Sequence, residues 1–192
     1  MRIFVGIDLP EQWRAALAAG AEAIRQAEPG WETEKWVLPE NLHVTLKFMG
    51  DVPDESVEFL GPDLVRALER VPRFTMPLHR ALLPSPDSRK VSMLWTTLKD
   101  PEGAAAGLVS CIEDVAADYG VVPSSRHFHP HITLVRTRTT RGIKSAEEAA
   151  RIIESTLPSD LTMSVPAVTV YKSALTKYRP VYERLAIVDL SD

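Results

Sequence analysis

Two histidines, His43 and His131, each precede a threonine by two positions within an apolar run. The first motif reads His-Val-Thr-Leu and the second reads His-Ile-Thr-Leu, so the pattern His-x-Thr-Leu occurs twice. In a β-strand, alternate side chains point to the same face. Each histidine would therefore share a face with its threonine, Thr45 or Thr133, while the apolar residues anchor the other face in a core.

Two imidazoles on either side of one phosphate suit general acid–base catalysis. Histidine titrates near neutral pH, so one ring can be neutral while the other is protonated. The neutral ring can take a proton from an attacking water and the other can protonate the leaving oxygen, each transfer contributing roughly 10²–10⁴-fold. The Thr45 and Thr133 hydroxyls can donate hydrogen bonds to phosphate oxygens. This chemistry requires no metal or other cofactor.

A buried structural histidine and a zinc site are the alternatives to catalysis. For one His-x-Thr-Leu string, a hydrogen-bonded core histidine would be favoured, but its repetition favours function. His127, His129 and His131 alternate, and imidazole is a common zinc ligand. Pro130 interrupts that run, however, and zinc would leave His43 and both threonines unexplained. We therefore expect His127 and His129 in a loop or at the entry to a strand.

Composition limits the class of protein. The chain has 192 residues, of which 45% are hydrophobic, and a net charge of −4. These values fit a single folded domain and argue against a basic surface for coating long nucleic acids. The single cysteine, Cys111, excludes an intrachain disulfide and a cysteine-rich zinc site. No apolar run approaches the ~20 residues of a membrane span, and no signal peptide is indicated, so we expect a cytoplasmic protein.

Hydrophobic periodicity predicts the elements that position the two motifs. Helices are expected over residues 10–28, 54–71, 102–120 and 145–157, with Ser145 as the N-cap of the last. Strands are expected over residues 2–9, 41–49, 73–83, 91–98, 128–136, 161–175 and 181–190. Each half, approximately 1–98 and 99–192, contains a helix, a motif strand, a helix and two strands. The order predicts an internal duplication within one α+β domain over residues 1–192, with mostly antiparallel sheets.

These features resemble a known superfamily, the 2H phosphoesterases. Within it, the chain resembles the RNA 2′,3′-cyclic phosphodiesterases, historically called 2′-5′ RNA ligases. Residues 39–50, PENLHVTLKFMG, resemble the first motif of the family, and residues 126–136, RHFHPHITLVR, resemble the second. The opening strand RIFVGIDLP and the closing YKSAL and PVYERL segments extend the resemblance to both ends. It is weakest at about residues 73–99, where a longer polar segment precedes the Leu-Trp strand.

The resemblance implies a bilobal fold with pseudo-twofold symmetry and an active cleft between the lobes. It also implies hydrolysis of a terminal RNA 2′,3′-cyclic phosphate to a 2′-phosphate, with His43 as proton donor and His131 as proton acceptor. Thr45 and Thr133 would bind the phosphate. The partners would be RNA 3′ ends or small cyclic nucleotides, and the protein would be a monomer. The sequence itself contains no asymmetry that assigns the two roles.

Phe48 and Arg136 each follow their histidine by five positions. The family implies that these residues stack on the terminal base, for which an aromatic ring and a guanidinium are suited. Strict alternation would place both on the face opposite the histidines, so each strand must twist, bulge or end before them. A core Phe48 and a solvated Arg136 are the alternative. By the same parity, Lys47 would share the face of His43.

Other functions use the same residues differently. The two histidines could join RNA strands through a 2′-5′ linkage, which is the reverse reaction. A nucleotide- or RNA-binding module without turnover is an alternative of another class. Among the aromatic residues, we expect Trp95 and Tyr182 in the core and Trp36 at the mouth of the cleft.

Overall fold

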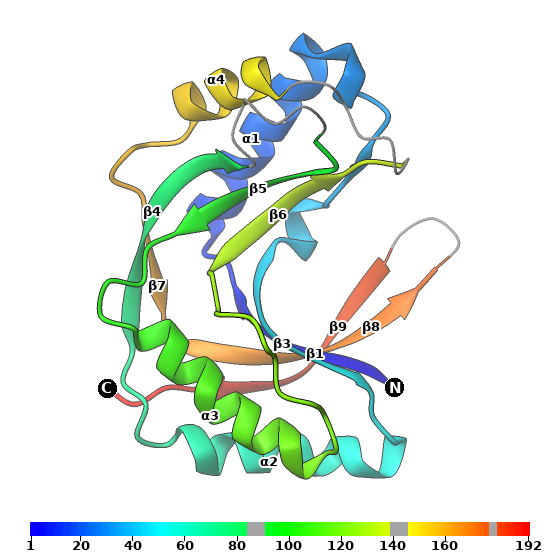
Figure 1. Cartoon of the computed structure of the whole chain (residues 1–192), viewed down its shortest axis with the longest axis vertical. Helices are drawn as coiled ribbons and strands as arrows, with labels where there is room; N and C mark the ends of the chain where they lie inside the picture. The colour runs from blue at the N-terminus through cyan, green and yellow to red at the C-terminus, as the bar shows by residue number, and fades with distance from the viewer. Residues whose placement is uncertain (84–90, 139–145, 177–179) are drawn as a thin grey trace.

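The computed structural model describes residues 1–83, 91–138, 146–176 and 180–192 (Figure 1). Within these ranges the strands are β1 (Arg2–Asp8), β2 (Lys35–Trp36), β3 (His43–Asp51), β4 (Phe74–Leu83), β5 (Met93–Leu98), β6 (His131–Arg136), β7 (Thr162–Val165), β8 (Ala167–Leu175) and β9 (Pro180–Asp189). The helices are α1 (Glu11–Ala27), α2 (Asp54–Leu68), α3 (Ala104–Asp118) and α4 (Glu147–Thr156), with short 3₁₀ turns η1 (Pro29–Trp31) and η2 (Pro39–Asn41). No helix in these ranges is long and apolar enough to cross a membrane.

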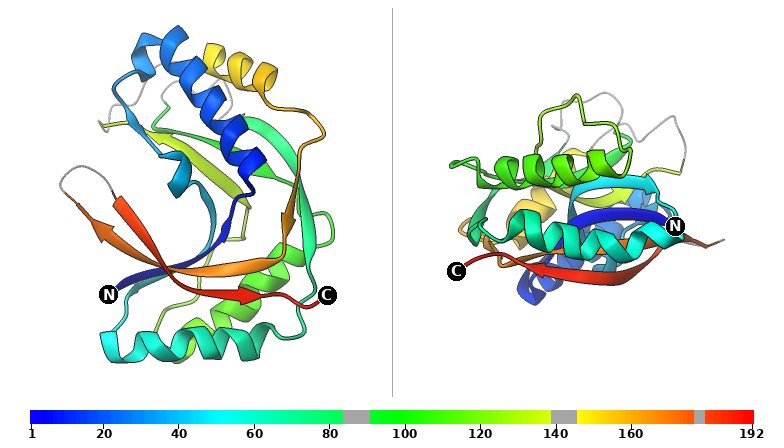
Figure 2. Two further views of the ribbon diagram at one scale, coloured as in Figure 1. Left: turned by 180° about the vertical axis from the view of Figure 1, so that it is seen from behind. Right: turned by 90° about the horizontal axis from the view of Figure 1, so that it is seen from below.

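The strands of the described chain form one curved sheet in the order β7-β4-β5-β6-β3-β1-β8-β9, with β2 paired to β6. Every pairing between these named strands is antiparallel. Helices α1 and α4 lie side by side over the β4–β7 part, and α2 and α3 cover the β1, β3, β8 and β9 part (Figures 1 and 2). The expected bilobal α+β fold is therefore confirmed.

The two lobes are not the two halves of the sequence. Strand β1, near the N-terminus, pairs with β8, near the C-terminus, and β6 lies between β5 and β3. Helix α1 follows β1 directly but packs in the other lobe, against α4. The division expected between residues 98 and 99 consequently does not coincide with a boundary in the sheet.

The expected strand over residues 161–175 is two strands. Pro166 separates β7 from β8, because proline lacks the N–H group that a continuing ladder requires. Strand β7 pairs with β4 in one lobe, and β8 pairs with β1 in the other. The break at Pro166 therefore carries the chain from one lobe to the other.

Two sequence expectations fall on or beside residues that the structure does not describe. Ser145, the expected N-cap of α4, lies outside the described ranges. Ala146 precedes the helix without a side-chain cap, and Glu148 accepts a hydrogen bond from Arg151. The polar segment that the sequence places between the strands expected over residues 73–83 and 91–98, residues 84–90, also lies outside the described ranges.

Both motif strands bulge at the leucine of the His-x-Thr-Leu pattern. The pairing of β3 with β1 skips Leu46, and the pairing of β6 with β5 skips Leu134. An extra residue changes the face that the following side chains occupy. The bulge required by the sequence is therefore present in each strand, and it returns Phe48 and Arg136 to the face of the histidines.

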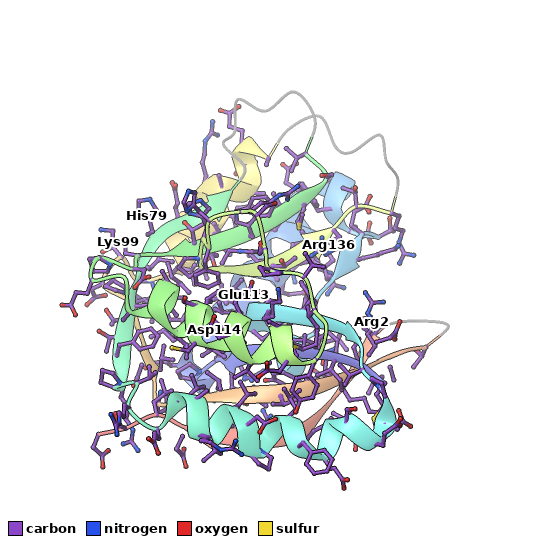
Figure 3. The ribbon with its side chains drawn as sticks, turned by 60° about the horizontal axis from the view of Figure 1, so that its bottom comes forward. Arg2, His79, Lys99, Glu113, Asp114 and Arg136 are labelled. Carbon is purple, nitrogen blue, oxygen red and sulfur yellow. The ribbon has the colours of Figure 1, made fainter. Side chains whose placement is uncertain are left out.

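The bulge in β3 also corrects the expectation for Lys47. This side chain is 7% exposed, lies on the face opposite His43, and its ammonium group donates to the Glu113 carboxylate of α3 and to the Val122 carbonyl, 3.0 Å away. Figure 3 shows Glu113 on α3 beside β3. Lys47 therefore ties α3 to β3 and does not add positive charge beside the histidines.

Replacing Lys47 with methionine should lower the free energy of unfolding by about 1.5–3 kcal/mol, because it removes a charge-assisted hydrogen bond from the Glu113 carboxylate, which is only 17% exposed. The double variant Lys47→Met/Glu113→Leu should recover most of this loss. Urea unfolding measures both. Arg151→Met, which breaks an exposed pair with Glu147, is the control and should change stability by at most about 1 kcal/mol. A single Lys47 variant as stable as the double variant would contradict the expectation.

Candidate active site

The two histidine motifs meet where β3 pairs with β6. Val44 lies directly opposite Ile132 in this antiparallel pairing, and both side chains are fully buried. Opposite residues of an antiparallel pair share a face, and their neighbours along each strand project to the other face. The half-buried side chains next to this pair are the two histidines and two threonines of the motifs, His43, Thr45, His131 and Thr133. The pairing thus brings all four together on one face.

That face is the one turned away from the helices. Leu134 of β6 and Leu42, just before β3, line a cavity of about 220 Å³ against α1. On the same side, Lys47 reaches α3. By the alternation of β3 and β6, the histidines lie on the opposite face of the sheet. Figure 1 shows the helices on the outer side of the curved sheet, so the face of the histidines is its inner side. Their location agrees with a site shared by the two lobes.

Both imidazoles are oriented by the backbone in the same way. The Nδ1 atom of His43 lies 2.7 Å from the Asn41 carbonyl oxygen, and that of His131 lies 2.8 Å from the His129 carbonyl oxygen. A carbonyl oxygen only accepts, so Nδ1 carries the proton in each ring. In the neutral rings Nε2 is then the acceptor, and in the protonated rings it is a second donor. Each Nε2 is therefore the atom that can exchange a proton with a ligand.

The surroundings of the two histidines differ. Three aromatic rings enclose His43, those of Phe4 and Tyr182 at centroid distances of 4.8 and 5.4 Å and that of Tyr171 at 6.0 Å. Its Nε2 lies 3.0 Å from the Thr45 hydroxyl. Burial lowers the pKa of His43, and the positive charges of Arg14 and His131 act in the same direction. The Asn41 carbonyl and the Asp8 carboxylate oppose that shift.

Tyr182 and Trp95 lie on the face of the histidines, so their expected place in the core is wrong. Both are half-buried, with Tyr182 beside His43 and Trp95 at a centroid distance of 5.7 Å from His131. The periodic pattern could not separate the two faces of these strands, because both faces carry apolar or aromatic residues. Trp36 lies against α1 instead of at a cleft mouth, since it lines the cavity beside that helix and donates to the Trp31 carbonyl.

Phe48 and Arg136 lie at equivalent positions around the histidines. Phe48 is 62% exposed and its ring contacts Phe4, which in turn contacts His43. Arg136 is exposed at the end of β6 (Figure 3). Its guanidinium, with that of Arg2, opposes the rise in the pKa of Tyr182 that burial causes. Phe48 and Arg136 are thus both accessible on the face that carries the histidines.

The remaining histidines lie away from this group or at its edge. His127 and His129 are exposed in the segment before β6, as expected, and His79 is exposed on β4 (Figure 3). Among the described residues, no group of three or more His, Cys, Asp or Glu side chains is placed to hold a metal ion.

Sequence reasoning missed a polar network beside His43. Asp8, opposite His43 in the pairing of β1 with β3, accepts hydrogen bonds from Tyr171, Arg14 and Arg184. Its signal in the sequence was a carboxylate at the end of an otherwise apolar strand. That Asp8 lies beside His43 and Tyr171 follows only from the pairing of β1 with β3 and with β8, and the order of the elements along the chain does not predict these pairings.

Gly6 allows β1 to lie close to the backbone of β3 beside His43. It lies opposite Thr45, whereas Trp95 holds the equivalent place opposite Thr133. A Cβ atom on Gly6 would lie 2.9 Å from the Val44 carbonyl oxygen and 3.5 Å from Cδ2 of His43. The first distance is too short for a real contact and involves backbone, so a side chain at Gly6 would push β1 from β3.

Gly6→Ala should therefore lower the free energy of unfolding by about 1–3 kcal/mol and shift the ring resonances of His43. Urea unfolding and NMR of the imidazoles measure these effects. Gly107→Ala is the matched control, because a Cβ there meets open space on α3 and alanine should stabilise the helix by about 0.5–1 kcal/mol. If Gly6→Ala matched the wild type in both measurements, the close approach would have no consequence.

Comparison with known proteins places this arrangement in a family. The family model for LigT-like phosphoesterases matches residues 7–93 and 98–182. The RNA 2′,3′-cyclic phosphodiesterase of Escherichia coli is 32% identical over 135 residues, 70% of this chain and 71% of the relative. The structure of TT0787 from Thermus thermophilus superposes with a TM-score of 0.73 at 26% identity, covering 99% of this chain and 98% of that one.

A second solved structure carries a nucleotide. Escherichia coli LigT in complex with 3′-AMP superposes with a TM-score of 0.69 at 27% identity, covering 100% of this chain and 98% of that one. The matches extend over both lobes and both motif strands. The chain therefore belongs to the LigT-like phosphoesterase family.

Proposed function

We propose that this protein hydrolyses terminal 2′,3′-cyclic phosphates of RNA, or of small cyclic nucleotides, to 2′-phosphates. The observation that carries the proposal is the pairing of Val44 with Ile132, which sets two histidines and two threonines on one face. The names of the similar proteins, RNA 2′,3′-cyclic phosphodiesterases from several organisms, support the same reaction. The Nε2 atom of each ring, which the backbone does not hold, can supply the proton transfers that the reaction needs.

In the proposed reaction, the oxygen of a water molecule attacks phosphorus while His131 Nε2 takes its proton. The bond between phosphorus and the 3′ oxygen breaks, and protonated His43 donates its Nε2 proton to that oxygen. The phosphate stays on the 2′ oxygen. Thr45 and Thr133 donate hydrogen bonds to the non-bridging oxygens. The reaction ends with His43 neutral and His131 protonated, and exchange of protons with solvent restores the starting state.

A substrate phosphate favours the protonated donor. Burial lowers the pKa of His43 in the free protein, which disfavours the imidazolium form. A phosphate anion beside the ring would act in the opposite direction, because a neighbouring negative charge stabilises the imidazolium. Binding of substrate would thus prepare His43 for its role as acid.

Phe48 and Arg136 are proposed to clamp the terminal base. Their accessible side chains lie at equivalent positions beyond the two bulges, one on each lobe. An aromatic ring and a guanidinium can each stack on a base without reading its hydrogen-bonding edge. Such a clamp would accept more than one base.

His43→Ala and His131→Ala should each reduce turnover of an oligonucleotide with a 2′,3′-cyclic phosphate end by at least about 100-fold, because each removes one proton-transfer group. Product mapping should find a 2′-phosphate with the wild type. His79→Ala, an exposed histidine on β4, should retain full turnover. Near-normal rates for both site variants would reject the proposal. A 5′-hydroxyl strand added to the same reaction tests for 2′-5′ joining.

Phe48→Ala should raise KM by the loss of one base stack, worth roughly 1–3 kcal/mol, with a smaller effect on kcat. Steady-state kinetics with a cyclic nucleotide measures the two constants separately. Phe59→Ala on α2 is the control, since this ring is similarly exposed, at 58%, but lies in the helix outside the sheet. An unchanged KM in the Phe48 variant would contradict base stacking.

A further inference from the structure

The neighbouring strands break the symmetry of the two histidine motifs. Strand β1 lies beside β3 as β5 lies beside β6, with the bulges at the same place. The residue opposite His43 is Asp8, and the residue opposite His131 is Thr97. Opposite residues share a face, so one histidine has a carboxylate beside its strand position and the other has an uncharged hydroxyl.

The Asp8 carboxylate is held in its ionised form. One oxygen, Oδ1, accepts hydrogen bonds from the Tyr171 hydroxyl, from Arg14 at 3.0 Å and from Arg184 at 3.1 Å, and Oδ2 pairs with Arg184 Nε at 3.0 Å. Burial alone would raise the pKa of Asp8, but the Tyr171 hydrogen bond and the two guanidinium groups lower it below the ordinary value. The negative charge is therefore present throughout the neutral pH range.

The same network reaches the backbone that orients His43. Arg14 donates from Nη1 to the Pro39 carbonyl at 2.7 Å, at the start of the η2 turn. That turn ends at Asn41, whose carbonyl accepts the Nδ1 proton of His43. Asp8, through Arg14, thus joins a fixed charge near the ring to the turn that sets its tautomer.

We propose that Asp8 is a positioning residue that makes His43, and not His131, the proton donor of the pair. The inference rests on the proposed hydrolysis and extends it, because it explains why two equivalent motifs take different roles. Asp8 acts through His43 by its charge and by its hold on Arg14. It does not contact the reacting atoms.

Among the described charged groups that act on His43, Asp8 is the one that favours a protonated ring. The titratable and charged groups that act on this ring or contact it are Asp8 on β1, Arg14 on α1, His131 on β6, Tyr171 on β8 and Tyr182 on β9, and Arg184 on β9 pairs with Asp8. Asp8 is the anion among them at neutral pH. Without it, the charges of Arg14 and His131 would disfavour a positive charge on His43 with no anion to oppose them.

The test compares two leaving groups in Asp8→Asn. On a normal 2′,3′-cyclic phosphate, the variant should lose at least about tenfold in kcat, because a general acid contributes roughly 10²–10⁴-fold and this one would be less protonated. On an analogue with sulfur in place of the bridging 3′ oxygen, the loss should largely disappear, since a thiolate leaves without a proton. His43→Ala should show the same dependence on the leaving group, and His131→Ala should not.

A second measurement follows the ring itself. NMR titration should show a lower pKa for His43 in Asp8→Asn than in the wild type, and Asp8→Glu should recover part of the difference. Two variants serve as controls. Tyr171→Phe keeps the Asp8 carboxylate, so its rates on the oxygen and sulfur substrates should remain close to those of the wild type. Thr97→Val changes the residue opposite His131 without altering charge, so the pKa of His43 should stay the same.

The outcomes separate the inference from the proposed function. Equal losses on the oxygen and sulfur substrates, with an unchanged pKa of His43, would reduce Asp8 to a structural residue and overturn the inference. A loss confined to the sulfur substrate would also overturn it. If the wild type itself failed to open the cyclic phosphate, the proposed function would fail, while the NMR titration would still show whether Asp8 controls the protonation of His43.

Discussion

The pairing of Val44 with Ile132 is the constraint on which the rest of the structure depends. It joins β3 to β6, and through them it joins the two lobes into one sheet. Because each residue is the second of its motif, the antiparallel register sets each histidine across from the threonine of the other motif. If the register between β3 and β6 shifted by one residue, the histidine and threonine of one motif would face the core while those of the other would not. The apolar residues that fix the register therefore also bring the four motif side chains together.

The two bulges determine which face of each strand Phe48 and Arg136 occupy. Within a regular strand, a residue five positions after a histidine faces away from it. Skipping Leu46 and Leu134 puts two consecutive residues on the packed face, and Phe48 and Arg136 then return to the accessible face. The burial of Lys47 against Glu113 is the other consequence of the same bulge.

Much of this could be predicted, and the failures have physical causes. The elements and the shared face of the motif residues follow from periodicity, which is local. The composition of the lobes does not follow from periodicity, because β1 pairs with β8 at the far end of the chain and no local sequence pattern predicts that pairing. The run over residues 161–175 is strand-like throughout, so only the pairing of β7 with β4 shows that Pro166 divides it. Lys47 was placed on the wrong face because parity holds only until a bulge, whose position depends on the neighbouring strand.

A duplicated motif does not show how the surroundings of its two histidines differ. Two histidines with the same backbone hydrogen bond and the same threonine neighbour have the same intrinsic chemistry, so any difference in their behaviour must come from outside the motifs. Here the differences lie one strand away, where Gly6 and Asp8 stand opposite the first motif and Trp95 and Thr97 opposite the second. Burial among aromatic side chains disfavours a charge on the His43 ring, and the Asp8 carboxylate opposes that effect. In the reaction we propose, the difference between acid and base would therefore come from β1 and β5, because the two motifs supply equivalent groups.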